Sequence, residues 1–206
     1  MNWKAFLLTL AAPLVSCTAE PAKPLAEKQP IPETAETLVV AAGCFWCVEE
    51  IYEEIPGVYE AVSGFTGGPE KNPTYEQVSA GATGHTEAVE IYYDPEVTNV
   101  TKLLKPFWAS FDYTNGRGVA PDFGSQYRPE LFYSTDEEKK AMEMSKAEAA
   151  KLVDKPVAVP ITKLEKFYPA SDYHQDFARR NPSQGYVKAV SIPRLKRTLK
   201  ALGMDD

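Results

Sequence analysis

The sequence has little cysteine, little histidine and no excess of positive charge. Three of its 206 residues are cysteine, two are histidine, and its formal net charge is −7. Because a negatively charged protein has no general attraction for phosphates, we expect no nucleic-acid partner. No internal repeat is visible at periods of about 20 to 50 residues, which argues against a solenoid or a propeller.

Hydrophobic runs near the N-terminus are also short. Residues 5–15 form an apolar stretch that follows Lys4 and is too short to span a bilayer as a stable helix. The stretch ends in Leu14-Val15-Ser16-Cys17, a tetrad that resembles the lipobox of bacterial lipoproteins, in which the cysteine carries the lipid. We therefore interpret residues 1–16 as a lipoprotein signal peptide and Cys17 as the lipidation site. An ordinary secretory signal with an unrelated cysteine is the alternative.

Residues 17–36 are rich in proline, alanine, glutamate and lysine and show no periodicity. This composition is typical of a flexible tether. We expect a single catalytic domain over residues 37–206, attached to the bacterial cell envelope through the N-terminal lipid alone. Thr18, not aspartate, follows Cys17. By resemblance to other lipoproteins, this favours the outer membrane and the periplasm if the source is Gram-negative.

The expected domain contains only two cysteines, Cys44 and Cys47, three residues apart. Such a pair is not a disulfide scaffold, because a bridge across so short a loop restricts the unfolded chain little. The apolar run 38–42 before the pair predicts a buried strand. Apolar residues at helical spacing predict a helix over 44–55. Cys44 is therefore expected at a helix N-terminus, where the helix dipole favours the nucleophilic thiolate.

Strands and helices alternate along the rest of the chain, which predicts a mixed α/β fold around one sheet. Pro129 within 126–133 suggests that this strand lies at an edge or contains a bulge. The basic residues within 194–200 are interpreted as one face of a terminal helix. Expected strands are 36–42, 58–66, 86–93, 126–133 and 156–164, and expected helices are 44–55, 101–111, 136–152, 172–179 and 193–202.

Five separated blocks of sequence resemble one known family. The blocks are Gly43-Cys44-Phe45-Trp46-Cys47-Val48-Glu49, Asn72-Pro73-Thr74-Tyr75, Gly84-His85-Thr86-Glu87-Ala88-Val89, Asp122-Phe123-Gly124-Ser125-Gln126-Tyr127-Arg128 and Asp172-Tyr173-His174-Gln175. In this order they resemble peptide methionine sulfoxide reductase A, the enzyme for the S epimer of methionine sulfoxide. The resemblance covers about residues 37–187. It implies a two-layer, ferredoxin-like plait with one mixed sheet, flanking helices and long loops that line the active site.

The resemblance assigns a role to each candidate site residue. It implies that Cys44 is the nucleophile and that Glu87 is the acid that protonates the sulfoxide oxygen. Tyr75 and Tyr127 would donate hydrogen bonds to that oxygen, and Asp122 would be a carboxylate that orients groups and water. Phe45 and Trp46 would form the pocket for the methyl group of the substrate. A carboxyl group in an aromatic, poorly hydrated pocket prefers to be neutral, and only a neutral carboxyl can donate a proton. No cofactor is implied.

The resemblance also implies the later steps of the reaction. Cys44 would become a sulfenic acid, and Cys47 would resolve it to a Cys44–Cys47 disulfide that a thioredoxin-like reductant recycles. Many family members instead have glycine at the position of Cys47 and a cysteine where this chain has Val187. Helical residues three apart have Cβ atoms about 5–6 Å apart, whereas a disulfide needs about 3.5–4.5 Å. The first helical turn must therefore deform when the bridge forms.

Two other functions remain open from the sequence. A thioredoxin-type thiol–disulfide oxidoreductase also uses Cys-x-x-Cys at a helix start, but it has no need of Glu87, Tyr75 or Tyr127. A peptide-binding envelope lipoprotein needs neither thiol. For the main hypothesis the expected partners are methionine sulfoxide-containing proteins and peptides and a thioredoxin-like reductant, and we expect a monomer.

The two histidines, His85 and His174, could in principle join Cys44 and Cys47 in a zinc site. Their spacing matches no compact zinc module. We therefore expect no metal site and assign both histidines to packing or hydrogen bonding.

Overall fold

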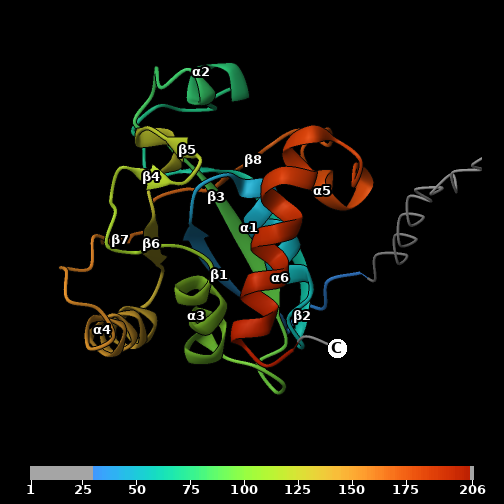
Figure 1. Cartoon of the computed structure of the whole chain (residues 1–206). Coiled ribbons are helices and arrows are strands. Elements are labelled where there is room, and N and C mark those ends of the chain that lie inside the picture. The colour runs from blue at the N-terminus through green and yellow to red at the C-terminus, as the bar shows by residue number, and fades with distance from the viewer. Residues whose placement is uncertain (1–29, 205–206) are drawn as a thin grey trace, which may run out of the picture.

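The computed structural model describes residues 30–204 (Figure 1). The predicted signal peptide, Cys17 and residues 17–29 of the predicted tether lie outside this range. Within it, none of the helices combines the length and the hydrophobicity that crossing a bilayer requires.

One six-stranded sheet forms the centre of the fold, with strand order β7-β6-β1-β3-β2-β8. All pairings are antiparallel except that of β6 with β7, so the sheet is mixed. The four central strands and two helices run in the order βαββαβ, which is the ferredoxin-like plait that the resemblance implied. The strands are β1 (Glu36–Ala41), β2 (Val58–Thr66), β3 (Thr86–Tyr93), β6 (Glu130–Tyr133), β7 (Ile161–Lys163) and β8 (Tyr168–Pro169).

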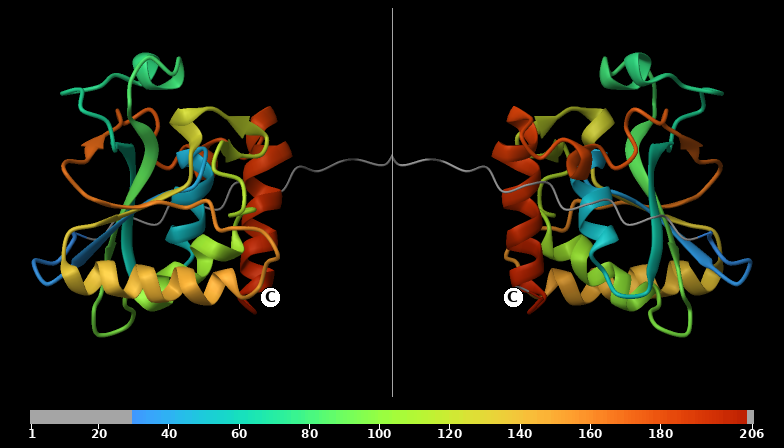
Figure 2. Two further views of the ribbon diagram at one scale, coloured as in Figure 1. Left: turned by 90° about the vertical axis from the view of Figure 1, so that its left-hand side faces the viewer. Right: turned by 90° about the vertical axis from the view of Figure 1, so that its right-hand side faces the viewer.

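The long helices gather on one face of this sheet (Figures 1 and 2). Helices α1 (Phe45–Glu53) and α3 (Val100–Ala109) lie next to the strands, and α6 (Ile192–Ala201) lies outside them. Helix α4 (Asp136–Ala150) packs beside α3 near one edge of the sheet, and its N-cap is Thr135. The C-terminal helix α6 therefore packs on other helices. This packing brings its N-terminal end close to the start of α1.

The alternating pattern of β3 explains how the two faces of the sheet differ. Val89, Ile91 and Tyr93 point into the main core under the helices. Ala88 points to the opposite face, where the loop residues Leu164 and Phe167 cover a smaller apolar cluster. The sheet is thus covered by helices on one side and by loop on the other.

The turn between β1 and α1 requires a glycine. Gly43 has φ +78°, and a Cβ atom built on it would lie 2.6 Å from the Cβ of Val119. Val119 belongs to a short hairpin of β4 (Gly118–Val119) and β5 (Asp122–Phe123) that packs on this turn. The sequence predicted only loop here, because two-residue strands leave no hydrophobic period to detect. The tight turn places Cys44 at the N-cap of α1, as expected.

The bounds of β2 and β3 match the prediction, whereas two predicted strands are shorter. The stretch 126–133 divides into a 3₁₀ turn, η1 (Ser125–Tyr127), and β6, which begins after Pro129. Because the proline precedes the strand, the sheet does not need the N–H that proline lacks. Strand β6 pairs with a neighbour on both sides, so the prediction of an edge strand or a bulge was wrong. In 156–164, Pro156 and Pro160 cannot donate hydrogen bonds to a ladder, and only Ile161–Lys163 is a strand.

The C-terminal part of the chain differs more from the sequence prediction. The predicted helix 172–179 is mostly turn, because Asp176 adopts a left-handed conformation (φ +54°) and α5 (Phe177–Arg180) begins only after it. A π-helical segment, η2 (Val187–Ser191), leads into α6. Arg194, which the sequence placed with the other basic residues on one face of the terminal helix, is buried, with 3% of its surface exposed.

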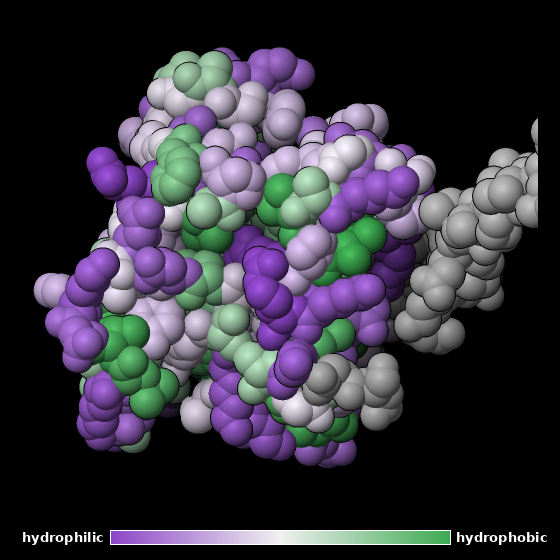
Figure 3. Space-filling view, in the orientation of Figure 1, coloured by the Kyte–Doolittle hydropathy of each residue, from purple (hydrophilic) through white to green (hydrophobic). Residues whose placement is uncertain are grey.

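Figure 3 shows mostly hydrophilic side chains on the face seen in Figure 1, interrupted by apolar patches. One apolar patch lies over α4, where Met144 and Leu152 are exposed. The residues considered for catalysis lie elsewhere, around the N-terminus of α1.

Candidate active site

The two cysteines occupy different depths at the start of α1. Cys44 is the N-cap residue and is 7% exposed, whereas Cys47, in the first turn, is 1% exposed. Neither is in a disulfide. Both residues are buried, and Cys44 is the more exposed of the two.

Glu87 contacts the first amide of this helix. The Phe45 N–H donates to the Glu87 carboxylate oxygen Oε2 at 2.9 Å. Glu87 is 2% exposed, and this burial raises the pKa of its carboxyl group to about 8, although the Phe45 hydrogen bond acts in the opposite direction. A carboxyl with that pKa is mostly protonated at neutral pH and can donate a proton beside Cys44.

Two tyrosines predicted from the sequence reach the same place from different elements. Tyr75 begins α2 (Tyr75–Ser79), a short helix closed by a capping box between Thr74 and Gln77. Tyr127 ends η1. Burial, followed by the charge of Glu87, raises the pKa of Tyr75 to about 12 and that of Tyr127 further. Both hydroxyls therefore stay protonated near Glu87 and are available as hydrogen-bond donors.

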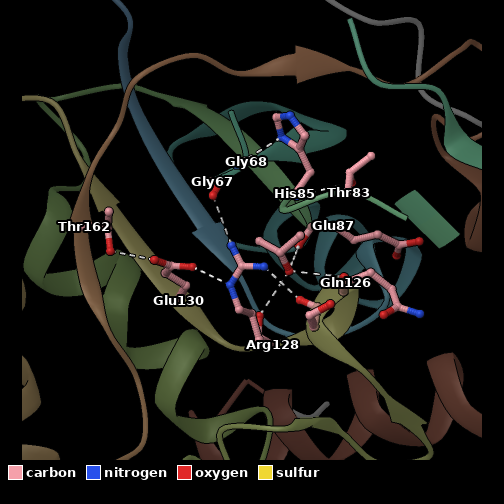
Figure 4. Close-up of polar contacts among 11 residues, drawn as sticks. Gly67, Gly68, Thr83, His85, Glu87, Gln126, Arg128, Glu130 and Thr162 are labelled. Carbon is pink, nitrogen blue, oxygen red and sulfur yellow. Dashed lines mark hydrogen bonds and ion pairs between the residues drawn. The ribbon is translucent and has the colours of Figure 1, made fainter. Parts of the chain in front are cut away.

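A polar network holds the segment that carries Tyr127 against the start of β3 (Figure 4). The buried Thr86 hydroxyl lies 3.1 Å from the carbonyl oxygen of Gln126 and 3.2 Å from that of Arg128. The Arg128 Nε donates to Glu130 at 2.8 Å, and the other oxygen of Glu130 accepts from Thr162 at 2.6 Å. Because Thr86 precedes Glu87 and Tyr127 lies between Gln126 and Arg128, the network fixes the acid and the tyrosine relative to each other.

Aromatic rings form one wall of the site. Trp46 stacks on Phe177 with centroids 3.8 Å apart, and Phe45 lies 5.3 Å from His174. The His174 ring is also 4.2 Å from that of Tyr75, and burial lowers the pKa of His174, so its imidazole is neutral at neutral pH. The structure thus places Phe45 and Trp46 in an apolar wall beside Cys44, with His174 as an additional member.

Asp122 lies on the other side of the cysteine pair. It accepts a short hydrogen bond from the Tyr186 hydroxyl, which is also 3.9 Å from the Cys47 sulfur. Burial raises the pKa of Asp122, and the Tyr186 bond opposes this rise. Tyr186 is a site residue that the sequence reasoning did not select, although it immediately precedes Val187, where many relatives have a cysteine.

The acidity of the two thiols differs from the sequence expectation. Burial raises the pKa of Cys44, and its hydrogen bond and charge interaction with Cys47 act in the same direction. The pKa of Cys47 falls to about 6, chiefly through the hydrogen bond from Cys44, with further contributions from the Arg194 charge and from Ser191. Near neutral pH the pair therefore shares one proton, and the surroundings of Cys47 favour the negative charge on its sulfur.

The two histidines have separate surroundings. The His85 ring accepts a hydrogen bond from the Gly68 N–H at 3.3 Å and contacts the Glu70 carbonyl oxygen at 2.8 Å, so it braces the loop before β3 (Figure 4). His174 lies in the aromatic wall. Within residues 30–204, no group of three or more metal-ligating side chains is arranged to hold an ion.

This arrangement suits a two-electron reduction at a soft atom. A sulfur nucleophile, a neutral carboxyl group and two tyrosine hydroxyls converge beside an apolar wall, and a second sulfur lies behind the first. This one cluster contains eight of the nine predicted site residues. The ninth, Cys17, lies outside the described range.

A family model described as "Peptide methionine sulfoxide reductase" matches residues 36–204. The chain is 42% identical to the peptide methionine sulfoxide reductase MsrA of Thermus thermophilus over 171 residues, which covers 83% of this chain and 96% of that protein. It is 44% identical to MsrA of Listeria innocua over 161 residues, 76% of this chain and 91% of that protein. Among solved structures, the reduced form of Mxr1 from Saccharomyces cerevisiae is similar with a TM-score of 0.70 and 28% identity, over 74% of this chain and 89% of that chain.

Proposed function

The chain belongs to the peptide methionine sulfoxide reductase family, and from this premise we propose that it reduces the S epimer of methionine sulfoxide in proteins and peptides. The chain is an oxidoreductase of the MsrA kind. The observation that carries the finer proposal is the buried Glu87 carboxyl, which contacts the first amide of the helix whose N-cap is Cys44.

The first chemical step joins Cys44 to the sulfoxide. The Cys44 sulfur attacks the sulfoxide sulfur, and its proton passes to the neighbouring Cys47 thiolate. Negative charge then develops on the sulfoxide oxygen, and Glu87 supplies the proton that this oxygen needs. The hydroxyls of Tyr75 and Tyr127 donate hydrogen bonds to the same oxygen. The oxygen leaves the substrate sulfur as hydroxide and bonds to the Cys44 sulfur, while the bond between the two sulfurs breaks with its electron pair on methionine. Methionine leaves, and Cys44 becomes a sulfenic acid.

Specificity for one epimer follows from the number of fixed contacts around the sulfoxide sulfur. The donors Glu87, Tyr75 and Tyr127 set the direction of the oxygen, the wall that contains Phe45 and Trp46 receives the methyl group, and Cys44 sets the line of attack. With these three directions fixed, only one handedness leaves the rest of the substrate chain pointing outward to solvent. The family resemblance supports the S epimer.

Cys47 resolves the sulfenic acid in the second step. Its sulfur attacks that of Cys44, the hydroxyl leaves as water with the proton held by the pair, and a Cys44–Cys47 disulfide remains. The sum is one sulfoxide and two thiols converted to one thioether, one disulfide and one water. A thioredoxin-like dithiol then reduces the bridge. Yeast Mxr1, a structural relative of this chain, has been solved in complex with Trx2, which supports a reductant of this class.

We also propose that the protein acts in the bacterial cell envelope as a lipid-anchored enzyme. The support is the Leu14-Val15-Ser16-Cys17 tetrad and the composition of residues 17–36. Mass spectrometry of the protein purified from membranes tests this: an acylated N-terminal Cys17 is expected, and an unmodified Cys17 on the mature chain contradicts it.

The epimer proposal is tested with peptides that contain only the S or only the R form of methionine sulfoxide. With dithiothreitol as reductant, we expect methionine to be released from the S peptide and not measurably from the R peptide. Equal release from both contradicts the specificity. Insulin reduction without release of methionine from either peptide would instead favour a thioredoxin-type oxidoreductase.

A further inference from the structure

The C-terminal helical segment encloses Cys47 on the side away from Cys44. The Ser191 hydroxyl oxygen lies 3.1 Å from the Cys47 sulfur, and Ser191 is 1% exposed. Ser191 ends the π-helical segment η2, whose wider turn occurs mostly at functional sites. A hydroxyl can donate to a sulfur anion, so this contact favours the thiolate form of Cys47.

Arg194 brings a buried positive charge to the same place. It is 3% exposed, and its guanidinium donates to the Ser110 carbonyl oxygen at 3.0 Å and to the Ser110 hydroxyl oxygen at 3.1 Å. Both acceptors are neutral, so these bonds orient the guanidinium without cancelling its charge. The charge lowers the pKa of Cys47 and opposes the rise that burial causes in the pKa of Asp122.

The other groups whose charge acts on Cys47 come from several elements. Cys44, Glu50 and Glu87 interact with it from α1 and β3, and Tyr186 approaches from the C-terminal segment. Burial is the main cause that raises the pKa of Glu50 to about 7 and that of Glu87 to about 8, so at neutral pH Glu87 is mostly neutral and Glu50 is about half ionised. Among these groups, Arg194 carries the positive charge that lowers the pKa of Cys47.

We propose that Ser191 and Arg194 are positioning residues that make Cys47 the leaving thiolate when the Cys44–Cys47 disulfide is reduced, so that the external dithiol forms its mixed disulfide with Cys44. The inference rests on the proposed function, because it concerns how that enzyme is recycled. It follows from two facts that act together. Cys44 is the more exposed sulfur, and the surroundings of Cys47 stabilise a negative charge.

Reduction of the Cys44–Cys47 bridge is a thiol–disulfide exchange in two steps. A thiolate of the external dithiol bonds to the Cys44 sulfur, the Cys44–Cys47 bond breaks, and its electron pair stays on Cys47. The second thiol of the external dithiol then attacks the partner sulfur that is bonded to Cys44. This attack releases the Cys44 thiolate and leaves the external partner as a disulfide. A leaving thiolate of lower basicity departs faster. The helix that buries Cys47 thus both shields this sulfur from attack and accepts the charge that it acquires.

The direction of attack is tested on the full-length protein oxidised with diamide, so the result does not depend on sulfoxide turnover. Glutathione is added, the released thiol is trapped with iodoacetamide, and the peptide that contains both cysteines is sequenced by mass spectrometry. We expect glutathione on Cys44 and alkylation on Cys47. Glutathione mainly on Cys47, or no Cys44–Cys47 bridge after diamide, overturns the proposal. Correct labelling without methionine release would contradict only the proposed function.

The roles of Ser191 and Arg194 are tested by Ser191→Ala and Arg194→Gln. Thr198→Ala is the matched control, because the buried Thr198 hydroxyl contacts the Arg194 carbonyl within the same helix. We expect reduction of the disulfide by dithiothreitol to slow by about fivefold in each test variant and to be unchanged in the control. Equal rates in all three variants overturn the proposal.

A pH titration separates this role from simple loss of packing. In the Cys44→Ser background, the ultraviolet absorbance of the Cys47 thiolate is followed against pH, with and without Ser191→Ala. Loss of the hydroxyl is expected to raise the midpoint by about one unit. An unchanged midpoint shows that Ser191 only fills space and contradicts the assignment.

Discussion

The two sulfur atoms of the Cys44–Cys47 pair are three residues apart in the chain, but their surroundings are opposite in character. Cys44 faces Glu87, Tyr75 and Tyr127, which come from β3 and the loops and are all protonated at neutral pH. Cys47 faces the C-terminal helical segment, with a hydroxyl at 3.1 Å and a buried guanidinium nearby. One side of the pair can give protons to an oxygen, and the other can hold a negative charge.

This difference assigns the two halves of the catalytic cycle to different parts of the molecule. Protonation of the sulfoxide depends on β3 and the loops that pack on it, whereas recycling depends on the last helix. Changes on one side should therefore alter one half of the cycle with little effect on the other. The following substitutions test that separation, from the largest expected effect to the smallest.

Replacing the Cys44 sulfur should abolish both halves of the catalytic cycle. Cys44→Ser is expected to lower methionine release by at least about a thousandfold, because a hydroxyl is a poor nucleophile toward sulfur and cannot form the disulfide. Release is measured by chromatography of an oxidised peptide with dithiothreitol. Retention of more than a few per cent of the activity would show that another group attacks the substrate.

Replacing the Cys47 sulfur should abolish the second half of the cycle and only slow the first half, in which Cys47 accepts the proton of Cys44. Cys47→Ser is expected to release about one methionine per enzyme in a single turnover and then to lose at least about a hundredfold of its steady-state rate with thioredoxin, because no disulfide forms for the reductant to attack. Cys17→Ser, which removes the cysteine outside the expected domain, serves as the control and should recycle normally. Normal recycling by Cys47→Ser contradicts the resolving role.

The acid on the Cys44 side is tested by Glu87→Gln, which keeps the size of the side chain but cannot supply a proton. We expect kcat/KM to fall by about a hundredfold. The exposed neighbour of Tyr75, Glu76, provides a control in Glu76→Gln, which should behave like the parent.

The pH profile gives the sign of this effect. Glu87 must be protonated to act, and its pKa is about 8, so the activity of the parent should fall as the pH rises through about 8. The thiol pair must have lost one proton, and the pKa of Cys47 is about 6, so activity should also fall below about 6. Glu87→Gln should lose the upper limb and keep the lower one. An upper limb that persists in this variant assigns the proton to another group.

The smallest effect is expected from the network that supports the acid. Thr86→Val keeps the shape of the side chain but leaves the carbonyl oxygens of Gln126 and Arg128 without their hydroxyl partner. Because the segment between them carries Tyr127, we expect kcat/KM to fall by about tenfold while the recycling rate is unchanged. Thr86→Ser retains the hydroxyl and should recover most of the activity. Equal losses in both variants would show that the methyl group, not the hydroxyl, is what matters.

The sequence predicted the Cys44 side of the site better than the Cys47 side, for a physical reason. Strands β2 and β3 are nine and eight residues long, and their predicted bounds agree with the structure. The blocks that carry Tyr75, Glu87 and Tyr127 are local in sequence, and these residues lie at the start of α2, near the start of β3 and at the end of η1. Their meeting point beside Cys44 follows from the order of the strands.

The surroundings of Cys47 depend on contacts that no local pattern encodes. Ser191 lies 144 residues from Cys47, and the π-helical turn that aims it has no hydrophobic period of its own. Arg194 sits in a basic stretch that resembles a solvent-facing helix, and only its packing against Ser110 buries it. The same limitation explains why the acidic thiol was expected at Cys44, since the helix dipole is visible from sequence but burial and Arg194 are not.

Gly43 has a consequence for how this protein tolerates change. Because its Cα carries a second hydrogen in place of a side chain, Val119 can lie against the turn, and the β4–β5 hairpin rests on the backbone that presents the reactive sulfur. Any larger residue at position 43 would push the hairpin, with Asp122, outward. A deep mutational scan should therefore find position 43 intolerant even of alanine, and insertions between Gly118 and Phe123 about as harmful as changes to the cysteine itself.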